Sequence, residues 1–242
     1  MLEYHFKNIE FFYSPPDNIS GNNYIISGEE YNHLKKVLRK SIGDNIFIVD
    51  GNNYIYNCTI KEIKKDFIIA KINNINLHKN ELDLNIHLAV GLLKNPSRYD
   101  FIIEKATELG VKKITPFNSQ YTIANNPKIE RWKNIAISAM KQSQRAFLPE
   151  IEECKKFDEI LDLKADLKLI ADIESEDLQI NNQDSLQDIL IIIGPEGGFS
   201  DIEISKAISY GFKKFKLSNT RLRTETAAII SIPNILHTLN KL

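Results

Sequence analysis

Two loops near the C-terminal end of the chain carry the residues best placed for chemistry. Residues 194–200 read Gly-Pro-Glu-Gly-Gly-Phe-Ser and follow the apolar run 189–193, and residues 217–227 read Leu-Ser-Asn-Thr-Arg-Leu-Arg-Thr-Glu-Thr-Ala. Each loop leaves a strand-like segment and leads into a helix-like one, and ligands of open α/β sheets bind at that edge. The two loops therefore indicate one small-molecule site with charged side chains beside it.

The glycine-rich loop matches neither common nucleotide-binding pattern. It lacks the Lys-Ser/Thr pair that ends a P-loop, and it does not read Gly-x-Gly-x-x-Gly. A triphosphate would be repelled by Glu196, so a ligand without phosphate groups fits the loop better. The alternative is that the glycines form only a tight turn, which the loop alone does not exclude.

Composition limits the partners that this protein can have. The chain has 242 residues and a formal net charge of −1, which suits two domains and provides no global attraction to nucleic acid or membrane. The two cysteines, Cys58 and Cys154, fit no disulfide or metal spacing, and the five histidines form no cluster. Since no signal peptide or membrane span is visible, we expect a cytoplasmic protein without a metal or a membrane partner.

The first part of the chain reads as short strands and turns typical of a small barrel. A hairpin is expected over residues 44–60 around the Asp50-Gly51 turn, and a further strand over residues 65–70. One helix is expected over residues 27–39, with Ser27 and Glu30 forming a capping box. The polar residues 74–81 are interpreted as a linker.

From residue 82 onward, strands alternate with helices, which predicts a parallel sheet. Strands are expected over residues 82–93, 112–117, 167–171, 189–193 and 212–217, and helices over 96–109, from 126–127 onward, and over 157–163, 200–211 and 224–239. Asn95 is the expected N-cap of the first of these helices, and Ser200 with Glu203 is a second expected capping box.

Five segments resemble, in order and spacing, motifs of the RsmE family, the uridine N3-methyltransferases of small-subunit rRNA in the SPOUT superfamily. They are residues 33–39 (His-Leu-Lys-Lys-Val-Leu-Arg), 104–111 (Glu-Lys-Ala-Thr-Glu-Leu-Gly-Val), 142–145 (Gln-Ser-Gln-Arg), 194–198 and 223–227 (Arg-Thr-Glu-Thr-Ala). The similarity extends over nearly the whole chain, and residues 223–227 are its most specific part.

The resemblance implies an α/β protein in two parts. A PUA-like small β-barrel over residues 1–73 would bind RNA, and after the linker a SPOUT α/β domain over residues 82–242 would end in a deep trefoil knot. It further implies methyl transfer from S-adenosylmethionine to N3 of a uridine in the decoding region of 16S rRNA of the small ribosomal subunit. A homodimer through the knot domain would complete each site from both subunits.

The cofactor site implied by the resemblance consists of three segments. Its expected residues are Ala171, Ile193, Gly194, Pro195, Glu196, Gly197, Leu217, Ser218, Leu222 and Thr226. Glycines here would let the backbone approach the ligand closely. The family usually has glycine at the position of Ser218, so a positive φ there would strain the loop.

Methylation at N3 requires loss of a weakly acidic proton, and the negative charge that develops must be stabilised. Arg223 is the expected catalytic residue, since a guanidinium has a permanent charge and several donors. Glu225 is a base or orients Arg223, and we favour the orienting role because an exposed carboxylate is a poor base for so weak an acid. An ion pair of Arg223 with Glu225 or with the opposite subunit is the structural alternative.

RNA contacts are expected from basic residues on two parts of the chain. They are His33, Lys35, Lys36, Arg39, Lys94, Arg98, Arg145 and Arg221. Neutralisation of phosphates by such patches makes binding steeply salt-dependent, although any single lysine is also an ordinary solvated residue. Two other functions remain open: another SPOUT reaction on a ribose 2′-hydroxyl or a tRNA base, and a non-catalytic RNA-binding module, which Ser218 favours.

Overall fold

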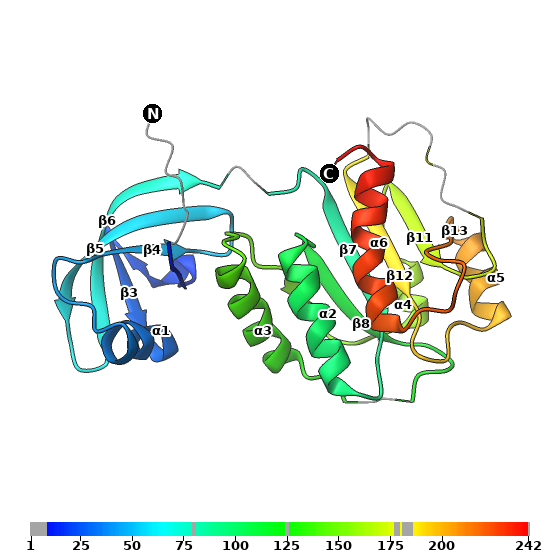
Figure 1. Ribbon diagram of the computed structural model, residues 1–242, viewed down its shortest axis with the longest axis horizontal. Coiled ribbons are helices and arrows are strands. Elements are labelled where there is room, and N and C mark those ends of the chain that lie inside the picture. Colours follow the sequence, from blue (N-terminus) through cyan, green and yellow to red (C-terminus); the bar gives the residue numbers. More distant parts are fainter. Residues whose placement is uncertain (1–8, 79–80, 124–125, 177–179, 181–185, 242) are drawn as a thin grey trace. The chain divides into compact units, whose positions relative to one another are not determined.

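The computed structural model describes residues 9–78, 81–123, 126–176, 180 and 186–241. Contacts divide the chain into two compact units (Figure 1). The first unit comprises Met1–Glu81 with Ile137–Leu148, and the second comprises Leu82–Ala136 with Pro149–Leu242. The sequence predicts that the two domains are separated at one place, the linker 74–81. The contacts in the structure add a second, separate segment, Ile137–Leu148, to the first unit.

The first unit contains one six-stranded sheet in the order β1-β4-β5-β6-β3-β2. Its strands are β1 (Phe11–Tyr13), β2 (Ile19–Ser20), β3 (Asn23–Ser27), β4 (Asn45–Val49), β5 (Tyr54–Ile63) and β6 (Phe67–Leu77), with a 3₁₀ turn, η1 (Pro16–Asn18), after β1. Neighbouring strands are antiparallel except β1 and β4. The predicted hairpin is confirmed as β4 and β5. Strand β6 continues to Leu77, so it enters the segment expected to be a linker.

The expected single helix and its capping box are wrong in detail. A short helix, α1 (Gly28–Asn32), is followed directly by a π-helical turn, η2 (His33–Val37). Ser27 precedes α1 without a side-chain capping bond. The Glu30 carboxylate instead accepts hydrogen bonds from Lys141 Nζ at 2.5 Å and from the backbone N–H of Tyr13 at 3.3 Å. Partners distant in sequence therefore replace the local cap.

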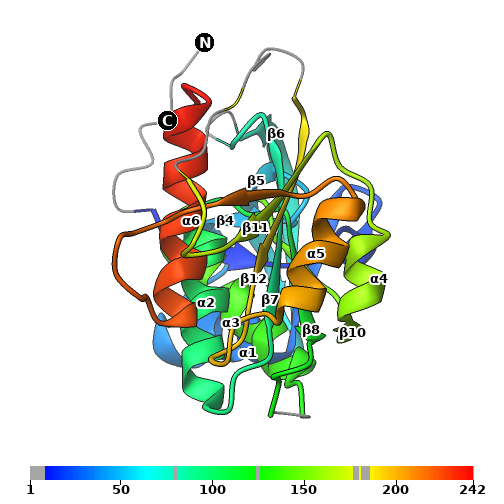
Figure 2. The ribbon, with the colours of Figure 1, turned by 90° about the vertical axis from the view of Figure 1, so that its right-hand side faces the viewer.

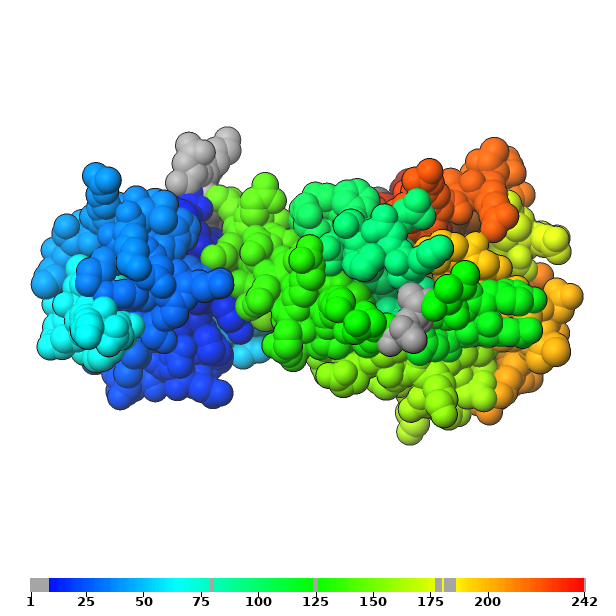
Figure 3. All heavy atoms as spheres, turned by 90° about the horizontal axis from the view of Figure 1, so that it is seen from below, coloured from blue at the N-terminus to red at the C-terminus, as the bar shows by residue number. Residues whose placement is uncertain are grey.

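Two groups of buried side chains stabilise the first unit. The larger one gathers the inward-facing residues of the sheet, including Tyr24, Ile48 and Ile68. The second group joins Phe11, Val49 and Ile55 to Met140 and Ala146, which come from the segment Ile137–Leu148. Figure 3 shows this segment, in green, against the blue N-terminal residues. The segment thus supplies part of the core of the first unit.

The second unit is built on a parallel sheet in the order β10-β8-β7-β12-β11-β13, with β9 also paired to β8. Its strands are β7 (Asn85–Gly91), β8 (Lys113–Asn118), β9 (Glu150–Ile151), β10 (Lys155–Lys156), β11 (Leu167–Ala171), β12 (Asp188–Ile193) and β13 (Lys213–Phe215). The expected parallel sheet is confirmed, since every pairing among these strands is parallel.

Helices cover both faces of this sheet (Figure 2). They are α2 (Pro96–Glu108), α3 (Ile129–Gln142), α4 (Phe157–Leu161), α5 (Asp201–Ser209) and α6 (Thr224–Thr238). Helices α2 and α6 lie on one face and α4 and α5 on the other. The predicted start of α2 is confirmed, because the Asn95 side chain accepts from the N–H of Ser97 at 3.0 Å. The capping box of Ser200 and Glu203 is also confirmed, whereas α3 begins only at Ile129.

The register of the strands brings three loops together. Ile170 pairs with Ile192 on one side, and Ala171 pairs with Phe215 on the other, so β11, β12 and β13 end at the same edge. The chain leaves each strand there as a loop. The sheet therefore positions the two loops singled out in the sequence next to the loop after β11.

Candidate active site

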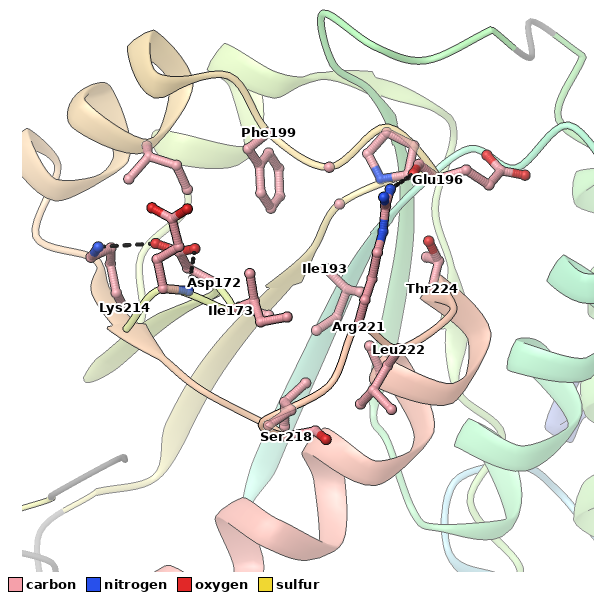
Figure 4. Close-up of a pocket in the computed structure, with 18 of the residues that line it drawn as sticks. Asp172, Ile173, Ile193, Glu196, Phe199, Lys214, Ser218, Arg221, Leu222 and Thr224 are labelled. Atoms are coloured by element: carbon pink, nitrogen blue, oxygen red, sulfur yellow. Dashed lines mark hydrogen bonds and ion pairs between the residues drawn. The ribbon is translucent and has the colours of Figure 1, made fainter. Parts of the chain in front are cut away.

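The three loops enclose a cavity of about 920 Å³ in the second unit (Figure 4). Its walls come from the residues after β11, from the glycine-rich loop after β12 and from the loop between β13 and α6. Apolar side chains, among them Ile173, Phe199 and Leu222, alternate with charged ones. This mixture suits a small ligand that has both an aromatic and a polar part.

Most of the expected cofactor residues lie around this cavity. Those that line it are Ala171, Ile193, Gly194, Pro195, Glu196, Leu217, Ser218 and Leu222. Gly197 and Thr226, both described by the structure, lie outside the lining. Asp172 and Ile173, in the expected loop after Ala171, and Phe199 also line it, although none of the three was among the individual residues expected. Their positions directly after β11 and after the pair Gly197-Gly198 were the available signal.

Glycines shape the loop after β12 through contacts with the protein itself. A Cβ atom on Gly197 would lie 2.6 Å from Tyr121 Cβ, and one on Gly194 would lie 3.1 Å from the Phe199 ring. At the end of β7, a Cβ on Gly91 would lie 2.6 Å from the backbone nitrogen of Pro195. A side chain at residue 197 would therefore collide with Tyr121.

Ser218 does not carry the strain that was expected of it. The described non-glycine residues with positive φ are Arg39, Asn53, Gln144 and Asn240, so Ser218 lies outside the left-handed region. Its hydroxyl accepts a hydrogen bond from the N–H of Thr220 at 3.1 Å and lies 3.1 Å from the Thr220 hydroxyl. The serine therefore forms a local turn in place of the usual glycine, and it no longer favours a non-catalytic protein.

Arg221 and Glu196 connect the second and first loops at the cavity. Arg221 Nη2 donates to the backbone carbonyl of Glu196 at 3.0 Å, as Figure 4 shows. The Glu196 carboxylate accepts from the backbone N–H of Lys94 at 3.0 Å. This places Arg221, expected to bind RNA, in a bond that joins two cavity loops.

The loop after β11 contributes an ion pair. Lys214 Nζ lies 2.9 Å from Asp172 Oδ2, and Asp172 Oδ1 accepts from the N–H of Glu174 at 3.1 Å (Figure 4). Both Asp172 and Lys214 line the cavity. The site therefore contains a fixed carboxylate beside apolar walls.

The two expected catalytic residues are not paired with one another. Arg223 is the exposed N-cap residue of α6, and its side chain has no hydrogen bond or ion pair to a described residue. Glu225 instead pairs with Arg98 of α2, whose Nε lies 3.5 Å from Glu225 Oε1. The expected orientation of Arg223 by Glu225 is therefore absent, because the carboxylate is engaged by another arginine.

Some of the basic side chains expected to bind RNA in the first unit have a bonding partner, and others have none among the described residues. His33 Nε2 lies 3.3 Å from Glu10 Oε1, and Lys35 Nζ lies 2.5 Å from the Tyr31 hydroxyl. Lys36 and Arg39 are exposed and without a side-chain partner among the described residues. We call Lys35, Lys36 and Arg39 the basic turn. Arg145 does not belong to such a surface, because its side chain is 14 % exposed and paired with Glu81.

A second polar cluster lies on strands β7 and β8 and the chain that follows β9. The Thr115 hydroxyl is hydrogen-bonded to His87 Nε2 at 2.6 Å and to the Glu152 carboxylate. Burial opposes ionisation of Glu152, but hydrogen bonds from Lys155 and Thr115 prevail and lower its pKa to about 2. Burial lowers the pKa of His87 to about 4, so the imidazole is neutral at pH 7. None of these residues lines the cavity.

The described residues contain neither a candidate metal site nor a candidate membrane span. No group of three or more His, Cys, Asp or Glu side chains there could hold a metal ion. Within the same part of the chain, no helix has the length and apolar character needed to cross a bilayer.

Comparison with known proteins defines the class. Residues 80–235 match the RNA methyltransferase domain family, and residues 26–73 match the RNA methyltransferase PUA domain family. Over 239 residues, the chain is 34 % identical to the ribosomal RNA small subunit methyltransferase E of Buchnera aphidicola subsp. Acyrthosiphon pisum, covering 93 % of this chain and 92 % of that one. The chain belongs to the ribosomal RNA small subunit methyltransferase E family, which confirms the resemblance seen in the sequence.

Solved structures support this assignment over the whole chain. The enzyme of the same name from Neisseria gonorrhoeae, bound to S-adenosyl methionine, has a TM-score of 0.84 and 31 % identity, over 95 % of this chain and 97 % of that chain. A methyltransferase from Legionella pneumophila in complex with the same cofactor has a TM-score of 0.83 and 30 % identity, over 96 % of this chain and 98 % of that chain. This chain is thus an RNA methyltransferase.

Proposed function

We propose that this protein transfers a methyl group from S-adenosylmethionine to N3 of a uridine in the decoding region of 16S rRNA. The observation that carries the proposal is the cavity enclosed by the loops after β11, β12 and β13. Its support is the family to which the chain belongs and the N. gonorrhoeae relative bound to S-adenosyl methionine.

The residues around the cavity fit this cofactor. Ile193, Leu217 and Leu222 provide apolar surface for an adenine ring, and the Asp172 carboxylate provides an acceptor for hydroxyl groups. Backbone groups of the glycine-rich loop face the same space. When bound, the cofactor supplies an electrophilic methyl group on a sulfonium.

The target base must give up its N3 proton before or as the nitrogen–methyl bond forms. Negative charge then spreads over N3, O2 and O4 of the uracil. Arg223 is the proposed group that stabilises this charge, because it lines the cavity, is exposed and has no competing side-chain partner among the described residues. The base must leave its stack to reach the site, which costs less in a single-stranded region.

The first unit is the proposed support for rRNA. The basic turn provides the positive charge that phosphates require, and His33 on the same segment is a proposed hydrogen-bonding contact. Lys94 is a separate proposed contact on the second unit. A net charge of −1 for the whole chain leaves such local patches as the source of attraction.

The trefoil knot and the homodimer also belong to this proposal, as does a cytoplasmic location. The strand order supports the knot, because the chain leaves β12 and returns as β13 on the far side of β11. Partly exposed Ile229 and Ile230 on α6 provide apolar surface for a second subunit. Light scattering at micromolar concentration tests the dimer, and a monomer contradicts it.

The decisive experiment uses labelled S-adenosylmethionine and small ribosomal subunits from cells that lack the enzyme. We expect tritium to appear in N3-methyluridine after nucleoside digestion and mass analysis. Label in a 2′-O-methyl nucleoside, or in tRNA offered as the alternative substrate, indicates another reaction of the superfamily. No label, with salt-dependent binding of subunits retained, indicates a non-catalytic RNA-binding protein.

A further inference from the structure

Arg98 lies at the cavity and is held there from another helix. It belongs to the first turn of α2 and lines the cavity, whereas Glu225 in the first turn of α6 lies outside the lining. Arg98 Nε lies 3.5 Å from Glu225 Oε1, and the two side chains are 33 % and 12 % exposed. Since α2 packs against α6, the pair is fixed by two helices of the same unit.

The pair leaves hydrogen-bonding groups unused on both sides. A guanidinium has five N–H donors, and among the described residues the Arg98 guanidinium is engaged only by Glu225. Glu225 Oε2 is buried and has no hydrogen-bond partner among the described residues. Arg98 therefore lines the cavity with donors that no described residue uses, and the contact with Glu225 restricts its position before a ligand arrives.

The proposed reaction calls for more than one such donor. The N3 atom of uracil lies between two carbonyl groups, so loss of its proton places negative charge on O2 and on O4. Arg223 accounts for one of these oxygens under the proposed function. Donors that are already oriented stabilise a developing charge without reorganisation at the moment of reaction.

We propose that Arg98, oriented by Glu225, is a second catalytic arginine that donates hydrogen bonds to a carbonyl oxygen of the target uracil as N3 loses its proton. The N3 electron pair then forms the bond to the methyl carbon, the carbon–sulfur bond breaks, and the proton passes to solvent. Glu225 is the positioning residue of Arg98. This inference rests on the proposed function.

The carboxylate beside Arg98 distinguishes this role from a contact with the RNA backbone. Attraction of a phosphate depends mainly on net positive charge, and a neighbouring carboxylate reduces that charge. Directed hydrogen bonds to a flat base depend instead on fixed geometry, which Glu225 provides. Arg98 was expected from the sequence to bind RNA, and under this inference it contacts the base and not the phosphates.

The test compares Arg98→Ala, Arg98→Lys and Glu225→Gln with wild type in single-turnover methylation of small subunits across a pH series. At neutral pH, we expect a loss of rate of about 10²-fold for Arg98→Ala. The expected loss is about tenfold for Glu225→Gln, which acts through geometry, and Arg98→Lys should fall between them. The single-turnover rate of each variant should also reach its plateau at a higher pH than that of wild type, because the uracil anion has lost a stabilising donor.

Two binding measurements and one control complete the experiment. Calorimetry should give wild-type affinity for S-adenosylmethionine, and the KM for subunits should stay within about twofold. Lys105→Ala, on the same helix and with a 31 % exposed side chain, is the matched control and should resemble wild type. Thermal unfolding shows whether Arg98→Ala is folded. If it is not, the rates of the conservative variants Glu225→Gln and Arg98→Lys test the inference instead.

Several results would overturn the inference. An unchanged single-turnover rate with a raised KM and a smaller salt dependence assigns Arg98 to a phosphate. Weakened binding of S-adenosylmethionine assigns it to the carboxylate of the cofactor. If wild type itself transfers no methyl group, the proposed function fails, which is distinct from an active wild type with an equally active Arg98→Ala.

Discussion

The cations at the cavity and those of the basic turn are held in different ways. Arg98 and Arg221 at the cavity have partners on other elements, at 3.5 Å from the Glu225 carboxylate and 3.0 Å from the Glu196 carbonyl. In the basic turn, Lys36 and Arg39 point into solvent without a partner among the described residues. A held cation can direct hydrogen bonds at one atom, whereas a free one contributes mainly to the electrostatic field.

Arg223 provides the most severe test of this comparison, because it lines the cavity yet is not held. We expect Arg223→Ala to lower the single-turnover rate of methylation by about 10²–10³-fold, since a charge-stabilising donor is lost. The affinity for S-adenosylmethionine, measured by calorimetry, should stay near that of wild type. Near-normal methyl transfer would show that only held arginines matter at this site.

Gly91→Ala tests whether the loop that holds the cavity together is itself fixed. The new Cβ would lie 2.6 Å from the backbone nitrogen of Pro195, so the loop after β12 must shift. Overpacking of this kind costs about 1–3 kcal/mol, and a shifted loop should weaken cofactor binding by about tenfold in calorimetry. Gly197→Ala is the matched comparison within the same loop, because its new Cβ would lie 2.6 Å from the Cβ of the exposed residue Tyr121 and not from a backbone atom of the loop after β12. Equal losses in the two variants would argue against a backbone obstacle.

Removal of the basic turn should affect binding and leave chemistry intact. For Lys35, Lys36 and Arg39 all changed to Ala, the slope of log affinity for rRNA against log salt should fall in magnitude by about 2 to 3. The rate at saturating RNA should equal that of wild type, because among the described residues Lys36 and Arg39 are free and Lys35 is engaged by Tyr31, so none of the three directs a hydrogen bond at a reacting atom. Filter binding over a salt series and single-turnover assays measure the two quantities. A reduced saturated rate would place the turn in the catalytic step.

Glu152→Gln extends the comparison to two lysines, Lys113 and Lys155, that are paired with a carboxylate but do not line the cavity. Lys155 Nζ lies 2.5 Å and Lys113 Nζ 3.5 Å from the Glu152 carboxylate. The folded-state pKa of about 2 is below the ordinary value of 4.5, so Glu152 stabilises the fold above pH 4.5 and less as pH falls toward 2. The variant should unfold at lower urea concentration at pH 7, with the difference vanishing toward pH 2. Its methylation rate should be unchanged, and a slower rate would contradict a purely structural role.

Much of the fold could be predicted because it depends on local signals. The Asn95 cap, the box of Ser200 with Glu203 and the β4–β5 hairpin each need only a few neighbouring residues. The predicted capping box of Ser27 and Glu30 failed because Lys141, more than a hundred residues away, binds Glu30. No single stretch of sequence contains that information.

The candidate site divides in the same way. The two loops were evident from glycines after apolar runs, and the strand order then placed them side by side. The Arg98–Glu225 pair was not foreseen, because it joins α2 to α6 across a long stretch of chain. Ser218 was misjudged, since its own hydroxyl supports a turn that the family usually makes with glycine.

The segment Ile137–Leu148 has a consequence for how such proteins can be recombined. Met140 and Ala146 bury part of the apolar surface of Phe11, Val49 and Ile55. A gene fragment that ends at residue 81 would therefore encode a sheet whose apolar surface around Phe11, Val49 and Ile55 is exposed. Such a surface favours self-association. An evolutionary exchange of the first unit alone could not proceed by a single cut at residue 81. The exchanged piece would also have to include the segment Ile137–Leu148, which lies between two parts of the second unit in the sequence. Exchange of one unit therefore requires changes within the gene region that encodes the other.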